Sequence, residues 1–209
     1  ESVWWLLKQA YDKNLIYNGY TIQPFSPKAG TGLSSHELNQ PGCYKMVKDT
    51  SVTAQFLLSE PSSVFGIKED VYLVAWTTTP WTLPSNTALA INRKVDYVLI
   101  KTLNLYTKKE IHVVLAEKLV TKVFSGPYIS KGEMSNPEKQ IPFEIIQSIK
   151  GSKLENLYYS QLISLKKPAQ DPENAFKVIH ADFVSTEDGT GIVHIAPTFG
   201  ADDAKAAQE

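Results

Sequence analysis

The sequence has few residues of several kinds, and each shortage excludes a class of protein. It contains one cysteine, Cys43, in 209 residues, which excludes an intramolecular disulfide and a cysteine-rich zinc site. Arg93 is its only arginine, so phosphates would meet lysines, which bind as point charges and not as bidentate forks. No apolar run approaches the roughly 18 residues of a membrane helix, and the first residues lack the features of a signal peptide. We therefore expect a soluble, cytoplasmic protein that contacts no membrane.

The charges of the chain nearly cancel. It has 21 Lys and Arg against 22 Asp and Glu, a net charge of -1, so no overall field attracts a polyanion, and any nucleic acid must bind through a local patch. With 43% hydrophobic residues, the chain can bury a full core and is not disordered. It starts without Met and ends within a helical pattern, so we expect it to be a fragment of a longer protein.

Short strands dominate the predicted secondary structure. Runs rich in β-branched and aromatic residues predict strands at 52–58, 71–76, 97–101, 111–115, 143–149, 176–183 and 191–195. Helical spacing predicts a helix over 2–15 with Ser2 as its N-cap, a short helix over 116–123 and a further helix from 201. We interpret 24–42 as a loop or loosely paired ribbon, and 128–140 as a polar insertion loop. These elements predict a mixed α/β, β-rich fold: a small closed or semi-closed barrel with peripheral helices.

The first unusual segment is residues 76–86, with the sequence WTTTPWTLPSN. Three consecutive threonines alternate sides in an extended chain, so their hydroxyls and amides can line both walls of a turn. Pro80 ends the preceding strand, and Pro84 forces a second bend. A strand end followed by a proline turn is the simpler interpretation, but it leaves two tryptophans flanking loop hydroxyls unexplained. This segment is therefore a candidate site.

The second unusual segment is residues 188–203, with the sequence DGTGIVHIAPTFGADD. A Gly-Thr-Gly turn leads into a strand that carries His194, and a Pro/Gly loop then brings Asp202 and Asp203 to a predicted helix start. Helix capping is the simpler role for these carboxylates. The functional alternative is a carboxylate that receives a cationic amine beside a histidine. A metal site from His194 and the two aspartates has too few ligands to be favoured.

Other site types find little support in the sequence. It has no Gly-x-Ser-x-Gly nucleophile elbow, and residues 28–32 (KAGTG) lack the Gly-Lys-Ser/Thr ending of a phosphate loop. No local feature marks the Cys43 thiolate as stabilised. His36, His112 and His180 occur singly, which is more typical of surface or strand histidines than of metal ligands.

Residues 76–86, 189–197 and 200–203 together resemble the editing domain of isoleucyl-tRNA synthetases, also called connective peptide 1. Residues 1–19 resemble the helix that leads out of the catalytic domain, and 151–157 a mid-domain strand of the family. The resemblance therefore covers essentially the whole chain. It implies a single editing domain at 1–209 excised from a larger synthetase, with a connecting helix and ribbon at 1–44 and a barrel core at 45–209.

Three details bear on the branch of the family. Thr79 and Trp81 stand where leucyl and valyl relatives typically carry arginine and glutamate, and Val193-His194 also fits the isoleucyl branch. The loop at 198–203 is similar to that of cytosolic eukaryotic or archaeal enzymes. A valyl- or leucyl-type editing domain and a non-enzymatic tRNA-binding barrel remain as alternatives.

The resemblance implies a hydrolase that deacylates valyl-tRNA(Ile). Valine lacks one methylene of isoleucine, and burying a methylene is worth only ~0.8 kcal/mol. A second site that hydrolyses the smaller product supplies the missing discrimination, and the isoleucyl system is the standard example of this device. By resemblance, Asp203 binds the α-ammonium of the amino acid, and His194 borders the side-chain pocket. His194 as a general base is an alternative that the sequence leaves open.

The other residues of the implied site lie in the first segment. By resemblance, Thr77, Thr78 and Thr79 hold the terminal adenosine and the hydrolytic water, and Trp81 and Asn86 shape the pocket. No activated Ser or Cys stands at a matched position, so water attacks the ester directly. The implied partners are the 3′ end of tRNA(Ile) and the rest of the synthetase. The hydrolysis needs no cofactor and no metal, whereas ATP and Mg²⁺ serve the synthetic domain, whose signatures this chain lacks.

Overall fold

The computed structural model describes residues 1–19, 21–124, 141–169 and 171–208. The chain forms two compact units, Glu1–Met46 and Val47–Glu209, which are described one after the other. None of the helices in the described ranges has the length and apolar character of a membrane span. The insertion loop predicted at 128–140 lies outside these ranges. The prediction that the two units make one editing domain stays a prediction.

The first unit begins with helix α1 (Ser2–Asp12). Its N-cap is Glu1, and no side chain caps it, so the prediction of Ser2 as the cap is wrong. The helix ends before residue 15, and its apolar side chains are exposed, Trp4 and Trp5 among them.

The rest of the first unit contains a small ribbon and a short helix. Strands β1 (Phe25–Ser26) and β2 (Thr31–Gly32) pair antiparallel, which confirms the loosely paired ribbon. Helix α2 (Ser35–Leu38) was not predicted, although Ser34 and Glu37 form a capping box at its start. That spacing is a known sequence signal of a helix start.

A five-stranded sheet is the centre of the second unit. Its order is β3-β4-β7-β6-β8, in which β4 and β7 are parallel and the other neighbours are antiparallel. All five strands were predicted. Their bounds are β3 (Val52–Leu57), β4 (Val71–Thr77), β6 (Asp96–Leu103), β7 (Glu110–Ala116) and β8 (Phe143–Lys150).

A three-stranded sheet carries the second motif of the sequence. The strand order is β10-β5-β9. Strand β10 (Val193–Ile195) runs antiparallel to β5 (Ala88–Ile91), and β9 (Lys177–His180) runs parallel to β5. Strand β5 was not predicted, and β9 is shorter than expected. Among the described residues, no sheet closes into a barrel. The β-rich mixed fold is thus confirmed, whereas its sheets stay open.

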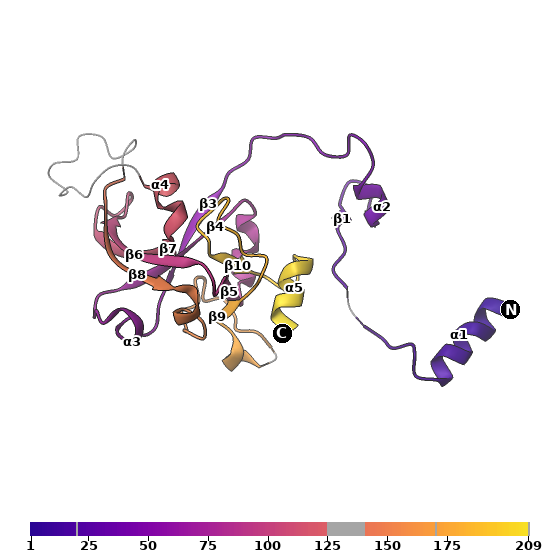
Figure 1. Ribbon diagram of the computed structural model, residues 1–209. Helices are drawn as coiled ribbons and strands as arrows, with labels where there is room; N and C mark the ends of the chain where they lie inside the picture. Colours follow the sequence, from indigo (N-terminus) through magenta and orange to yellow (C-terminus); the bar gives the residue numbers. More distant parts are fainter. Residues whose placement is uncertain (20, 125–140, 170, 209) are drawn as a thin grey trace. The chain divides into compact units, whose positions relative to one another are not determined.

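The helices of the second unit are short. The expected helix at 116–123 is a 3-10 turn followed by an α-helical turn. The expected helix from 201 is α5 (Ala201–Gln208), which packs against β10 (Figure 1). Residues 151–157 contain a 3-10 turn and not the strand expected from the resemblance. The bounds are α3 (Ser62–Phe65), η1 (Pro80–Ser85), η2 (Glu117–Leu119), α4 (Val120–Val123), η3 (Gly151–Lys153), η4 (Pro172–Asn174) and α5 (Ala201–Gln208).

The central strands of the five-stranded sheet, β4, β6 and β7, are buried on both faces. Leu73 and Leu99 face the core shared with the three-stranded sheet, whereas Val74 and Ile100 face a second cluster that includes Val120 of α4. Successive side chains of a strand point to opposite faces, so burial on both sides requires continuous apolar runs. This is why β4 and β6 lack the hydrophobic–polar alternation of a half-exposed strand.

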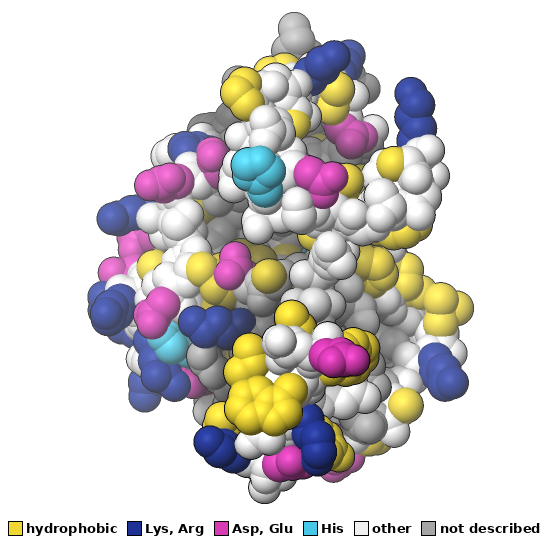
Figure 2. Space-filling view, turned by 90° about the vertical axis from the view of Figure 1, so that its right-hand side faces the viewer, with side chains coloured by type: hydrophobic (Ala, Val, Ile, Leu, Met, Phe, Trp, Pro, Cys, Tyr) yellow, Lys and Arg dark blue, Asp and Glu magenta, His cyan; other side chains and the backbone are white. Residues whose placement is uncertain are grey.

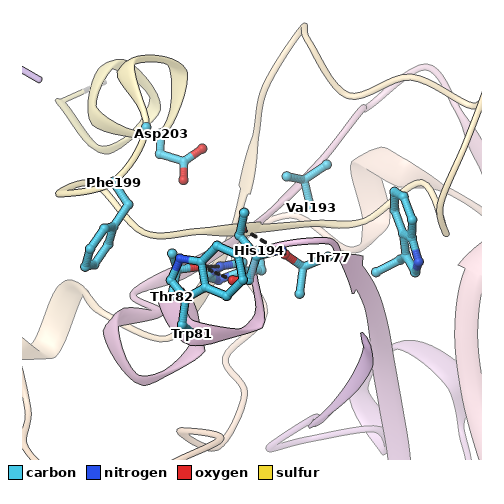
Figure 3. Close-up of a pocket in the computed structure, with 10 residues that line it drawn as sticks. Thr77, Trp81, Thr82, Val193, His194, Phe199 and Asp203 are labelled. Atoms are coloured by element: carbon cyan, nitrogen blue, oxygen red, sulfur yellow. Dashed lines mark hydrogen bonds between the residues drawn. The ribbon is translucent and has the colours of Figure 1, made fainter. Parts of the chain in front are cut away.

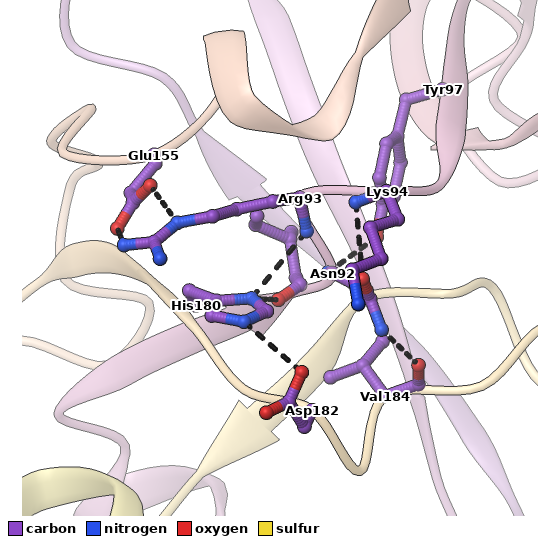
Figure 4. Close-up of polar contacts among 9 residues, drawn as sticks. Asn92, Arg93, Lys94, Tyr97, Glu155, His180, Asp182 and Val184 are labelled. Carbon is purple, nitrogen blue, oxygen red and sulfur yellow. Dashed lines mark hydrogen bonds and ion pairs between the residues drawn. The ribbon is translucent and has the colours of Figure 1, made fainter.

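Polar contacts join the ends of β5 and β9 to the loop before β6 (Figure 4). Arg93 donates two hydrogen bonds to Glu155, with Nε–Oε2 at 2.6 Å and Nη2–Oε1 at 2.5 Å. The bond raises the pKa of Arg93 and lowers that of Glu155. His180 contacts Asp182 at 3.3 Å, and the Asn92 side chain donates to the Val184 carbonyl at 3.2 Å. These contacts stabilise the ends of β5 and β9. Strand β5 in turn pairs with β10, which carries His194.

The face drawn in Figure 2 carries charges of both signs. Figure 2 shows basic and acidic side chains interspersed over one face, with hydrophobic side chains between them. This distribution agrees with the net charge of -1.

Candidate functional site

The two segments singled out in the sequence meet at one cavity of about 370 Å³. Figure 3 shows Asp203 and Phe199 on one side of His194, and Thr77 and Val193 on the other. The cavity lies where the end of β4 and the turn η1 approach β10 and the start of α5. The lining residues are Trp76, Thr77, Thr79, Trp81, Thr82, Val193, His194, Phe199, Gly200 and Asp203.

The threonine run forms a tight turn at the end of β4. The Thr77 hydroxyl accepts a hydrogen bond from the Thr79 amide at 3.0 Å and lies 3.2 Å from the Thr79 hydroxyl. Thr77 and Thr79 line the His194 cavity, whereas Thr78 lines a neighbouring cavity together with residues 188–192. Thr77 lines both cavities, so the turn places Thr78 and Thr79 on different sides, and Thr78 does not line the cavity of His194.

The Gly-Thr-Gly turn positions β10. Gly189 and Gly191 have positive φ angles of 76° and 74°, a backbone conformation that residues with a Cβ atom rarely adopt. A Cβ atom on Gly191 would overlap the Cβ of Ala116 at the end of β7. The Gly191 carbonyl also accepts a hydrogen bond from the buried Tyr97 hydroxyl at 2.7 Å. The backbone must approach β7 this closely for His194 to reach the cavity.

Both ring nitrogens of His194 are hydrogen-bonded to other side chains. Nε2 lies 2.8 Å from the Thr82 hydroxyl, which itself donates to the Thr79 carbonyl at 2.8 Å. Nδ1 lies 3.2 Å from Nδ2 of Asn86. His194 is buried, with 7% of its surface exposed, so these contacts replace those that water would supply.

The directions of these bonds assign the tautomer of His194. Asn86 Nδ2 also donates to the Ala88 carbonyl at 2.8 Å, and Asn86 Oδ1 accepts from the Tyr159 hydroxyl at 2.6 Å. Because an amide nitrogen only donates, Nδ1 of His194 must accept, and the proton of the neutral ring lies on Nε2. The Thr82 hydroxyl then accepts from Nε2. Neither ring nitrogen has a free lone pair.

The surroundings also keep His194 neutral. Burial lowers the pKa of the imidazole, and the Asp203 carboxylate opposes this shift by favouring the charged ring. Burial has the larger effect. A charged ring would also place an N–H group against the Asn86 amide nitrogen, where no acceptor is present.

Asp203 presents a carboxylate to the cavity from the first turn of α5. Its Oδ2 atom accepts a hydrogen bond from the Ala196 amide at 3.0 Å, which fixes the side chain against the loop after β10. Asp202 is exposed and does not line the cavity. The cavity lining thus holds one carboxylate and no lysine or arginine. Such a surface suits a small cation such as a primary ammonium group.

The structure brings most of the predicted site residues together. Thr77, Thr79, Trp81, His194 and Asp203 line one cavity, and Asn86 contacts His194 from behind. Their functional roles stay predictions. Among the described residues, no group of three His, Cys, Asp or Glu side chains is arranged to hold a metal ion.

Sequence reasoning missed four residues around His194. Thr82 belongs to the first motif, but its contact with His194 spans 112 positions and has no local signal. Phe199 and Val193 lie within the second motif and were not selected. Tyr159 lies far from both motifs in the sequence, so only the fold reveals its bond to Asn86.

Comparison with known proteins finds isoleucine–tRNA ligases by sequence and synthetase editing domains by fold. The chain is 54% identical over 210 residues to an isoleucine–tRNA ligase of Bacteroides fragilis and 56% identical over 211 residues to that of Cytophaga hutchinsonii, covering all of this chain in both cases. The chain is homologous to one segment of the isoleucine–tRNA ligases. It spans 18% of the length of these relatives. No family model matches the chain.

Solved structures show that this chain shares its fold with synthetase editing domains. The crystal structure of GlLeuRS-CP1 matches with a TM-score of 0.56 at 18% identity, over 76% of this chain and 59% of that one. The editing domain of P. falciparum cytosolic leucyl-tRNA synthetase matches with a TM-score of 0.56 at 13% identity, over 74% and 63%. The two sequence relatives above are bacterial, so they give no support to the expected eukaryotic type.

Proposed function

We propose that this chain is the post-transfer editing hydrolase of an isoleucine–tRNA ligase and deacylates valyl-tRNA(Ile). The observation that carries the proposal is a single cavity that combines the Asp203 carboxylate, the wall formed by His194 and the hydroxyls of the threonine turn. The 3′ end of the tRNA and the rest of the synthetase are the proposed partners.

Asp203 binds the α-ammonium group of the amino acid in this proposal. A charge-assisted hydrogen bond to the free oxygen of the carboxylate orients the ester within the cavity. The bond from the Ala196 amide keeps the carboxylate in place before the substrate arrives. Orientation of this kind lowers the entropic cost of reaching the transition state.

Hydrolysis then proceeds by attack of water on the ester carbonyl carbon. The water oxygen forms the new C–O bond, the bond to the ribose oxygen breaks, and the ribose oxygen takes up a proton to leave valine and tRNA. The Thr77 and Thr79 hydroxyls position the water. His194 serves as a wall and not as the base, because its lone pair on Nδ1 is occupied by Asn86.

The test is to incubate the purified chain with valyl-tRNA(Ile) and isoleucyl-tRNA(Ile) in parallel and to measure the release of each amino acid. We expect faster release of valine than in buffer alone, little release of isoleucine, and the same rates in a chelator. Release of both amino acids at the buffer rate would refute the proposal. Loss of activity in the chelator would refute the metal-free mechanism.

A further inference from the structure

Tyr159 lies behind the site, on the side of Asn86 that faces away from His194. It does not line the cavity, and only 3% of its surface is exposed. Its hydroxyl donates to Asn86 Oδ1 at 2.6 Å, and Asn86 in turn contacts Nδ1 of His194. Tyr159 is therefore linked to the cavity through Asn86 and then His194.

The phenol ring of Tyr159 is fixed by two aromatic neighbours. Phe56 meets it edge-on with ring centroids 5.3 Å apart, and Phe176 does so at 6.1 Å. The Tyr159 amide also donates to the Phe176 carbonyl at 2.9 Å. Phe176 has a positive φ of 61°, a strained conformation for a bulky residue that persists only where its surroundings hold it. The hydroxyl is thus aimed at Asn86 by a rigid support.

Two bonds together fix which end of the Asn86 side chain faces His194: the Ala88 carbonyl accepts from Nδ2, and the Tyr159 hydroxyl donates to Oδ1. With the Tyr159 hydroxyl on Oδ1, the amide nitrogen is directed to the Ala88 carbonyl and to His194. A reversed amide would place Oδ1 against the Ala88 carbonyl, and two acceptors repel. The chain of bonds from Tyr159 through Asn86 to His194 thus has one direction.

We propose that Tyr159 is a positioning residue which, through Asn86, holds His194 in one tautomer and one orientation against the cavity. The inference rests on the proposed function and deepens it, because it names what fixes the wall that excludes the larger amino acid. Without the phenol hydroxyl, Asn86 loses one of the partners that hold its side chain. His194 then samples a second tautomer and a second ring position, and the wall becomes less selective.

The test compares Tyr159→Phe with Thr102→Val in the 209-residue chain. Both changes delete one buried hydroxyl that donates a hydrogen bond, but Thr102 donates to the Pro142 carbonyl and contacts neither Asn86 nor His194. The imidazole nitrogen signals of histidine-labelled protein report the tautomer directly by NMR, and the His194→Ala spectrum identifies the signals of His194. The same proteins are assayed for release of valine and isoleucine from tRNA(Ile).

We expect the wild-type ring to show the Nε2–H form alone and Tyr159→Phe to show a mixture of the two neutral forms. The rate ratio of isoleucine to valine release should rise about tenfold, as the loss of one buried hydrogen bond allows. Thr102→Val should leave the His194 signals unchanged. In an Asn86→Ala background, Tyr159→Phe should add no further shift, because the path runs through Asn86.

Two outcomes overturn the inference: unchanged His194 signals in Tyr159→Phe, or equal shifts in Tyr159→Phe and Thr102→Val. If the wild-type chain releases neither amino acid and Tyr159→Phe still mixes the tautomers, the positioning role stands and the proposed function fails.

Discussion

Replacing His194 by alanine separates a steric role of the imidazole from a catalytic one. The ring is buried at the cavity wall and contacts Thr82 and Asn86 through its two nitrogens. The substitution removes several ring atoms, whereas isoleucine exceeds valine by one methylene. We therefore expect His194→Ala to hydrolyse isoleucyl-tRNA(Ile), which the wild-type chain rejects in the proposed function.

The magnitude follows from the size of the group that the wall rejects. One methylene in an apolar pocket is worth about 1–3 kcal/mol, which corresponds to a rate ratio of about 10–200-fold. The rate ratio of isoleucine to valine release should rise by this amount. The Thr82 hydroxyl and the Asn86 amide each lose a partner, and an unsatisfied buried group costs about 1–3 kcal/mol. Water that enters the enlarged cavity reduces this loss of stability.

The assay measures both deacylation rates side by side, with His112→Ala as the matched control. His112 lies on β7, does not line the cavity, and should leave both rates unchanged. If His194 were the general base, both rates would fall together by roughly 10²–10⁴-fold. A parallel fall of this size would refute the argument from the hydrogen bonds, whereas a rise for isoleucyl-tRNA supports it.

Three further predictions concern charge and backbone. Asp203→Ala should abolish release of valine, whereas Asp202→Ala should retain it; the reverse result would mean that the neighbouring aspartate binds the amine. The bond that lowers the pKa of Glu155 stabilises the fold above the ordinary glutamate pKa. Glu155→Gln should therefore lower the free energy of unfolding by up to ~1 kcal/mol at neutral pH, and denaturation should show this difference vanishing as the pH falls through the folded-state pKa. Gly191→Ala should lower the unfolding free energy more than Gly66→Ala, because both have positive φ but only Gly191 lacks room for a Cβ; equal losses of about 1–3 kcal/mol would show that φ alone matters.

The sequence predicts the strands of the large sheet because they are long apolar runs bounded by turns. Strand β5 was missed because Ala88–Ile91 is short and contains two alanines, which have little strand preference. Its strand conformation comes from pairing with β9 and β10, which no local pattern records. The predicted barrel failed for the same reason, since the closure of a sheet depends on pairings distant in sequence.

The candidate site was predictable where the chemistry lies within a motif. Asp203 and His194 share one segment, and the fold places both at the cavity. The support behind them was not predictable, because the bond from Tyr159 to Asn86 spans 73 positions. Thr78 was grouped with its neighbours from the sequence, whereas the alternation of an extended chain turns it into the next cavity.

The turn at the end of β4 acts as a partition between two adjoining cavities, one beside His194 and the other beside residues 188–192. Thr77 belongs to both linings, whereas Thr78 and Thr79 each belong to one. A substitution of Thr77 therefore alters both cavities at once, and its effect cannot be assigned to one of them. Changes at Thr78 and Thr79 report on one compartment each. A molecule large enough to occupy both cavities would contact Thr77, Trp76 and Val193, which the two linings share.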